Sequence, residues 1–170
     1  RSVNVCDSPF WSVAMGWNEF VEKHLVKATE AKDYYYAVVD HAAIVNTTSE
    51  EVLERAAEMV DNIKQNIRKH QANFRLLVMQ QKGNFDEAQE WAVDLVGQRN
   101  ARTLRFTTQR VPSFHVMDDE GIILLMPNPV RPAETLGSVF VTDSDLATEI
   151  RQTFEELWTA ARPAEGSLEG

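Results

Sequence analysis

Two short apolar runs, separated by a longer amphipathic stretch, constrain the fold of this 170-residue chain more than any other feature. Residues 34–39 are aromatic and β-branched, and residues 74–79 form a nearly continuous apolar run. Runs of this length and composition predict strands, and the second is typical of a strand covered on both faces. The stretch between them repeats its apolar residues at helical spacing. A strand, a helix and a second strand in this order predict a parallel pair joined by a right-handed crossover.

The neighbouring segments continue this alternation. A helix is expected over residues 9–31, where apolar residues again recur at helical spacing. The central helix is expected to begin with a capping box formed by Thr48 and Glu51. A further helix over residues 84–97 leads to a third strand at residues 103–107.

Beyond residue 107 the expected elements are three strands and one helix. Residues 114–117 and 122–126 flank the turn 118–121 and predict a β-hairpin. The acidic residues of that turn are interpreted as turn formers rather than as a cation site. A strand at residues 139–141 follows, and the last helix is expected to begin near residues 142–144.

This order predicts an α/β fold. We expect a three-layer α/β/α sandwich whose sheet is mixed and mostly parallel, with a C-terminal antiparallel hairpin. The length suits a single domain, which we place at residues 1–162. Residues 163–170 offer nothing to bury and are expected to form a flexible tail.

Net charge argues against two classes of partner. The formal charge is −9, in a chain that is 44% apolar and 25% charged. Such a field repels a phosphate backbone, so no direct nucleic-acid binding by this domain is expected. The same field argues against docking on anionic lipid. No window has the ~20 apolar residues of a membrane helix, so we expect no membrane association.

Residues that carry metal or covalent chemistry are few and scattered. The single cysteine, Cys6, allows neither an internal disulfide nor a thiolate zinc site, and it fits a reducing, cytoplasmic location. His24, His41, His70 and His115 are too far apart in sequence for a helical zinc motif. No Gly-rich phosphate loop and no nucleophile elbow is present. We therefore expect no metal and no cofactor.

One stretch of the C-terminal half resembles a known family. Residues 113–125, Ser-Phe-His-Val-Met-Asp-Asp-Glu-Gly-Ile-Ile-Leu-Leu, resemble the strand-turn-strand that carries the active-site motif of phospholipase D-like domains. Residues 139–143 and the helix after them, with Phe154 and Trp158, are similar to the end of such a domain. The resemblance extends over about residues 11–161, and it implies a phospholipase D-like α/β fold.

The sequence departs from the catalytic signature of that family. Active members carry His-x-Lys and, four residues later, Asp. The His attacks phosphorus, the Lys holds the phosphate oxygens and the Asp supports the His. His115 occupies the first position, but Met117 replaces the Lys and Ile122 replaces the Asp. A phosphoryl transition state spreads charge over several oxygens, so a site without the cation loses its main stabilisation. We therefore predict no catalytic residue and no enzymatic activity.

The resemblance also suggests what a non-catalytic domain of this kind could do. Such domains include the sugar-responsive effector domain of TrmB-type transcription regulators and the C-terminal module of some membrane-trafficking proteins. The expected function is ligand sensing or regulation, with this chain as the effector-binding half of a transcription regulator. We also expect the domain to form a homodimer.

A ligand site is expected beyond the carboxyl ends of the strands, where open α/β sheets place their pockets. Polar side chains with two cations gather there and suit a small polar or anionic ligand. The candidate ligand-binding residues are Asp40, His41, Gln80, Lys82, Thr108, Arg110 and His115. The alternative is that these are ordinary solvated loop residues, and the sequence leaves both interpretations open.

Two other functions also stay open. A protein-interaction module predicts an exposed apolar patch, with Trp11 or Leu136 in it, and no pocket. A phosphodiesterase-type enzyme predicts hydrolysis that depends on His115, against which the missing Lys and Asp argue.

Overall fold

One eight-stranded sheet organises the computed structural model, which describes residues 10–47, 49–132 and 134–166. The strands are β1 (Trp11–Met15), β2 (Tyr34–Asp40), β3 (Asn73–Met79), β4 (Leu104–Thr107), β5 (Phe114–Met117), β6 (Gly121–Pro127), β7 (Thr135–Thr142) and β8 (Arg162–Pro163). The α-helices are α1 (Gly16–Glu19), α2 (His41–Thr47), α3 (Glu50–His70), α4 (Phe85–Val96) and α5 (Ser144–Ala160). A π-helical turn η1 (Phe20–His24) and two 3₁₀ helices, η2 (Leu25–Glu30) and η3 (Gln98–Thr103), complete the described elements.

The sheet is mixed, and its strand order is β1-β7-β6-β5-β2-β3-β4-β8. Only β2, β3 and β4 are parallel, so five of the seven strand pairs are antiparallel. The expectation of a mostly parallel sheet is therefore wrong. The β5–β6 hairpin forms at the expected residues, but it does not extend the sheet at the C-terminal end of the chain. It pairs with β2 and continues through β7 to β1, which places it in the middle of the sheet.

The N-terminal segment differs most from its prediction. Residues 11–15, expected to be helical, form the edge strand β1, and helical structure begins only at Gly16. Gly16 has φ +75°, a conformation that glycine adopts without strain and that no helix interior contains. Residues 11–15 form a strand because they pair with β7. This pairing requires a glycine at position 137, since a Cβ there would lie 2.1 Å from the Ala14 carbonyl oxygen. Sequence periodicity cannot detect a pairing partner that lies in a distant part of the chain.

The long central helix forms as expected, with a different N-terminus. Ser49 caps α3, its hydroxyl accepting from the Val52 backbone N–H, and the Glu50 and Glu51 side chains lie in the first turn. The expected cap, Thr48, lies outside the described residues. The short helix α2, which directly follows β2, was not predicted.

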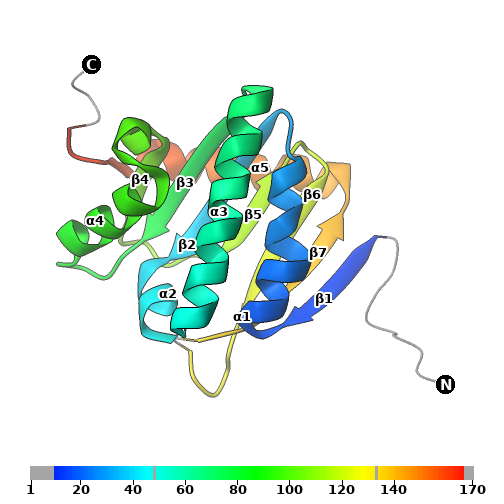
Figure 1. Ribbon diagram of the computed structural model, residues 1–170, viewed down its shortest axis with the longest axis horizontal. Coiled ribbons are helices and arrows are strands. Elements are labelled where there is room, and N and C mark those ends of the chain that lie inside the picture. Colours follow the sequence, from blue (N-terminus) through cyan, green and yellow to red (C-terminus); the bar gives the residue numbers. More distant parts are fainter. Residues whose placement is uncertain (1–9, 48, 133, 167–170) are drawn as a thin grey trace.

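Helices cover both faces of the sheet (Figure 1). α3, α4 and the continuous helical segment α1–η1–η2 lie on one face, which we call the α3 face, and α5 lies on the other, the α5 face. Alternation along β2 divides its three tyrosines, with Tyr35 toward the α3 face and Tyr34 and Tyr36 toward the α5 face. Two separate apolar cores result, one on each face.

The expected boundary between domain and tail falls inside the short strand β8, which pairs with β4. Ala164 is only 3% exposed, and the Glu165 backbone N–H donates to the Gln89 side chain. Pro163 and Ala164 are thus part of the packed domain rather than of a flexible tail.

None of the helices in the described ranges combines the length and the apolar character needed to cross a membrane.

Candidate functional site

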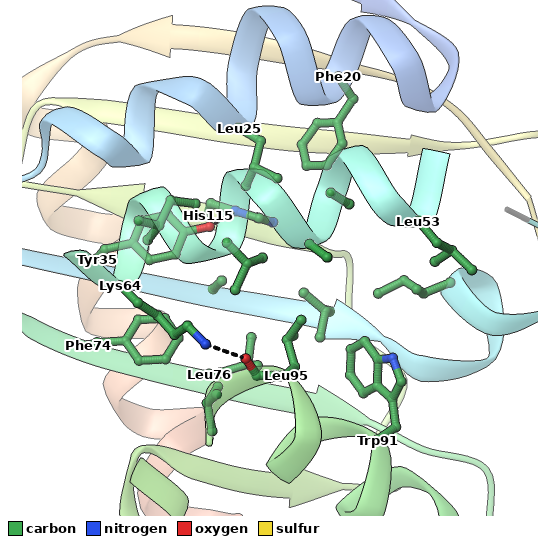
Figure 2. Close-up of a pocket in the computed structure, with 18 of the residues that line it drawn as sticks. Phe20, Leu25, Tyr35, Leu53, Lys64, Phe74, Leu76, Trp91, Leu95 and His115 are labelled. Atoms are coloured by element: carbon green, nitrogen blue, oxygen red, sulfur yellow. Dashed lines mark hydrogen bonds between the residues drawn. The ribbon is translucent and has the colours of Figure 1, made fainter. Parts of the chain in front are cut away.

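A largely apolar pocket of about 370 Å³ lies between α3 and the sheet (Figure 2). Its floor is formed by side chains of β2, β3 and β5, among them Tyr35, Leu76 and His115. Phe20 and Leu25 close one side, and Trp91 and Leu95 of α4 close the other. This is the volume and character of a small-molecule site, which is concave, mostly apolar and supplied with a few polar groups.

The C-terminal half of α3 is hydrogen-bonded to the helical elements on either side of it. The Asn66 side-chain amide donates to the Ala31 carbonyl over 2.6 Å, and Lys64 Nζ donates to the Leu95 carbonyl over 3.2 Å. The lining that α3 contributes is mostly aliphatic, and it includes two alanines, Ala56 and Ala57. The space beneath the helix remains unfilled around them.

Two polar side chains meet on the floor of this pocket. The Tyr35 hydroxyl and His115 Nδ1 are 2.5 Å apart, and both residues are almost completely buried. β2 and β5 are antiparallel neighbours, with Ala37 opposite His115 and Met117 opposite Tyr35, so the two side chains project from adjacent strands onto the same face. In Figure 2 the His115 ring and the Tyr35 hydroxyl lie beneath α3.

Burial keeps this pair uncharged. Desolvation lowers the pKa of His115 to about 3, so its imidazole is neutral at physiological pH. Desolvation also raises the pKa of Tyr35, so its hydroxyl stays protonated. The pair is therefore a neutral hydrogen-bonding group in an apolar surrounding.

The positions equivalent to the phospholipase signature do not surround His115 with charge. Met117 faces the same apolar core as the pocket, and Ile122 lies on the α5 face, across the sheet from the His115 ring. The cation that lines the pocket, Lys64, is already engaged, 3.2 Å from Asp61 Oδ1 and 3.2 Å from the Leu95 carbonyl. The described residues thus place no uncommitted cation where a phosphate would need one.

The structure separates His115 from the other candidate residues. Asp40 and Arg110, at the carboxyl end of β2 and in the loop after β4, form an ion pair. His41 is buried against the Trp91 ring, 5.3 Å between centroids, and desolvation lowers its pKa. Lys82 and Thr108 are exposed loop residues.

Gln80 is the one predicted strand-end residue with an unusual environment. It is 6% exposed, its backbone N–H donates to the Thr107 carbonyl, and its side-chain Oε1 is buried without a hydrogen-bond partner among the described residues. Gln80 does not line the pocket beneath α3. Of the seven predicted residues, His115 is the one that does.

Sequence reasoning missed the pocket itself. Tyr35 was not among the candidate residues, and helical periodicity gives no sign of a space beneath α3. The one sequence signal for Tyr35 is the alternation along β2, which separates Tyr35 from Tyr34 and Tyr36 and places it on the opposite face of the sheet. That α3 leaves a space over that face depends on how far the helix lies from the sheet, which no local pattern encodes.

No group of three or more His, Cys, Asp or Glu side chains within residues 10–47, 49–132 and 134–166 is arranged to hold a metal ion.

Solved structures show which fold this is. TrmBL2, an archaeal chromatin protein whose structure shows a novel mode of DNA binding, superposes with a TM-score of 0.64 at 14% identity, over 95% of this chain. Nuc from Salmonella typhimurium, a phospholipase D family member, superposes with a TM-score of 0.56 at 14% identity, over 90% of this chain and 97% of Nuc. Phosphatidylserine synthase from Haemophilus influenzae Rd KW20 gives 0.60 at 12% identity, over 91% of this chain and 38% of the enzyme.

These similarities establish a phospholipase D-like fold, as the sequence resemblance implied. The chain spans 56% of the length of TrmBL2. No curated protein matches the sequence. A family model described as "Domain of unknown function (DUF7436)" matches residues 5–164, nearly the whole chain, and the chain therefore belongs to this family.

Proposed function

We propose that this chain is a non-catalytic, ligand-binding regulatory domain that takes a small, largely apolar molecule in the pocket beneath α3. The observation that carries the proposal is the pocket itself: about 370 Å³, lined mainly by apolar side chains and floored by the buried Tyr35–His115 pair. A cavity of this size inside a small domain leaves its lining atoms without packing partners, which costs stability unless a ligand restores the contacts.

The pocket supports an apolar ligand better than the strand ends support the polar or anionic one expected from sequence. At those ends, Arg110 is paired with Asp40, and the second expected cation, Lys82, is an exposed loop side chain that solvent screens. An anion that binds Arg110 would first have to displace Asp40 from it. A ligand in the pocket beneath α3 fills empty volume and does not have to break an ion pair.

The absence of catalysis remains part of the proposal. Met117 and Ile122 occupy the positions of the missing Lys and Asp, and the neutral His115 is partnered by a tyrosine hydroxyl rather than by a carboxylate. A neutral imidazole can act as a nucleophile, but here no described cation is free to stabilise the charge that would develop on a phosphate.

Regulation is proposed because the fold also occurs in a DNA-binding chromatin protein. TrmBL2 is a chromatin protein, and this chain covers little more than half of it. We propose that the present domain likewise works within a larger protein or a homodimer. In that setting, α3 would transmit ligand occupancy, since it is the roof of the pocket.

A protein-interaction module is the second candidate. Phe10 and Met15, next to and in β1, are 67% and 52% exposed, and Leu136 of β7 is 37% exposed. Exposed apolar side chains at a sheet edge are typical of such surfaces. Unlike the first proposal, this one does not account for the cavity.

The test is binding of n-butylbenzene, an apolar probe that fits a cavity of this size. At ten times its Kd, a ligand that binds only the folded state adds about 1.4 kcal/mol of stability. For a domain of this length, that corresponds to a rise in melting temperature of about 3–6 °C.

Two variants on α3 show whether the pocket is responsible. Ala56→Phe fills the cavity from the roof and should abolish the shift, whereas Glu58→Phe, at an exposed position two residues away, should leave it intact. If the wild-type protein shows no shift, or if Ala56→Phe shifts as much as Glu58→Phe, the binding proposal fails and the interaction module becomes the better candidate. Hydrolysis of a simple phosphodiester that is lost in His115→Phe would contradict the non-catalytic part.

A further inference from the structure

We infer that the ligand of the pocket beneath α3 is a neutral molecule with an apolar body and one hydrogen-bond acceptor, a carbonyl or hydroxyl oxygen, that accepts a hydrogen bond from His115 Nε2. This inference rests on the proposed function, because it specifies the chemistry of a ligand for that same pocket.

The first step is the tautomer of His115. The Tyr35 hydroxyl is buried, and its hydrogen-bond partner among the described residues is His115 Nδ1. Desolvation raises the pKa of Tyr35, so the hydroxyl keeps its proton. Donating that proton to Nδ1 satisfies the buried O–H, whereas the opposite arrangement would leave it unpaired. Nδ1 is thus the acceptor, and the neutral ring carries its own proton on Nε2.

The second step is that this Nε2–H is uncommitted. The recorded interactions of the His115 ring are the hydrogen bond at Nδ1 and edge-on contacts with Phe20 and Tyr35, at centroid distances of 5.8 and 5.6 Å. No residue in the described ranges accepts from Nε2, although His115 lines the pocket. Since His115 lines the pocket, a ligand oxygen placed there can accept from Nε2 and add a hydrogen bond that a purely apolar ligand cannot form.

A second donor nearby does not compete for the ligand. Trp17 also lines the pocket, and its indole Nε1 has no partner among the described residues. That nitrogen is fully buried, so a ligand atom cannot reach it unless the indole ring moves. Trp17 packs edge-on against Phe20, 5.3 Å between centroids, and this contact holds the ring in place.

The third step is the charge of the ligand. A carboxylate in this pocket would be a buried anion, and it would need a cation to offset its desolvation. His115 does not supply one, since burial lowers its pKa to about 3. Lys64 is paired with Asp61 and donates to the Leu95 carbonyl. An uncharged oxygen of the ligand can accept from the Nε2–H without the desolvation cost of a buried anion.

Three probes of nearly equal size separate these possibilities by titration calorimetry at pH 7. They are 4-phenylbutan-2-one with a carbonyl, n-butylbenzene with no polar group, and 4-phenylbutanoate with a carboxylate. We expect the ketone to bind about threefold to tenfold more tightly than the hydrocarbon, the value of one net hydrogen bond. The carboxylate should bind at least about tenfold more weakly than the ketone.

His115→Phe tests the residue. It replaces the imidazole by an apolar ring, so the preference for the ketone over n-butylbenzene should vanish while n-butylbenzene still binds. If this variant does not fold, ¹⁵N NMR of histidine in the unaltered protein gives the same information. The His115 resonances should show the Nε2–H tautomer, and adding the ketone should shift Nε2 more than adding n-butylbenzene does.

The outcomes separate the two proposals. If n-butylbenzene and the ketone bind the wild-type protein equally well, or if the carboxylate binds best, the inference is overturned and the proposed function stands. If none of the three probes binds, the proposed function fails and the inference fails with it. A ketone preference that survives in His115→Phe would assign the hydrogen bond to another group and overturn the role given to His115.

Discussion

His115 illustrates how environment decides the chemistry of a single residue. Its ring is almost completely buried, accepts from the Tyr35 hydroxyl and has aromatic neighbours on two sides. The same position in an active phospholipase D-like domain would need a lysine and an aspartate, which are Met117 and Ile122 here. Burial without an ionic partner lowers the pKa of the imidazole, so the ring is a neutral hydrogen-bonding group at physiological pH.

This environment makes stability depend on pH. Between pH 6.5 and about 3 the unfolded chain binds a proton at His115 that the folded protein does not bind. The contribution of the neutral His115 to the free energy of unfolding is therefore fully present above pH 6.5. Below pH 6.5 this contribution is lost, by up to about 1.4 kcal/mol per pH unit. In urea unfolding at several pH values, His115→Phe should flatten this dependence. Equal slopes in the wild-type protein and in His115→Phe would contradict the neutral, buried state of His115.

At the scale of elements, the edge strand β1 depends on one glycine in its partner strand. β1 pairs with β7 over five residues, and Met15 lies opposite Gly137. At Gly137 the backbone of β1 approaches so closely that a Cβ would overlap the Ala14 carbonyl, 2.1 Å away. Backbone atoms cannot yield as a flexible side chain can, so the pairing requires glycine at this position.

Gly137→Ala should therefore displace β1. We expect a loss of about 1–3 kcal/mol or more of unfolding free energy, the cost of overpacking a site that cannot relax. Leu136→Ala, at the preceding and partly exposed position of the same strand, should change stability by less than about 1 kcal/mol. Urea unfolding followed by tryptophan fluorescence measures both, with Trp11 and Trp17 as nearby reporters. If Gly137→Ala were as stable as the wild type, β1 would not be paired as described.

For the whole molecule, the two faces of the sheet are packed differently. On the α5 face, Phe154 is fully buried, stacked on Tyr36 at 4.9 Å and on Trp158 at 5.8 Å. On the α3 face, a cavity of about 370 Å³ separates the helix from the strands. Close packing beneath α5 and unfilled space beneath α3 predict that truncating a buried side chain costs more stability on the α5 face than beside the pocket.

Two adjacent leucines of β3 test this asymmetry. Leu77 points to the α5 face and is fully buried, whereas Leu76 is 4% exposed and lines the pocket. Leu77→Ala should cost close to 5 kcal/mol, while Leu76→Ala should cost less than about 3 kcal/mol, because its side chain already lacks neighbours on one side. The measurement is denaturant unfolding of both variants under identical conditions. Equal losses, or a larger loss for Leu76→Ala, would mean that the pocket is filled by packing in solution.

Local patterns determined a large part of this protein. Composition and periodicity were sufficient to predict β2, β3 and β4, the helices α3, α4 and α5, the β5–β6 hairpin and the separation of Tyr35 from its two neighbours. These elements are marked by apolar residues that recur at short, regular spacing, so a short window of sequence is sufficient to predict them. The replacement of the catalytic Lys and Asp by Met117 and Ile122 is likewise a property of the sequence alone.

Only the tertiary structure decided the rest. Strand β1 forms through pairing with β7, and the antiparallel majority of the sheet follows from the pairing of β5 with β2. The pocket lies between α3 and the sheet, and its lining comes from helices and strands that are far apart in sequence. Each of these results from contacts between residues far apart in sequence, and their energies depend on geometry that no window of residues contains. Tertiary packing likewise placed His115 in the apolar pocket and left most of the other predicted residues at the strand ends.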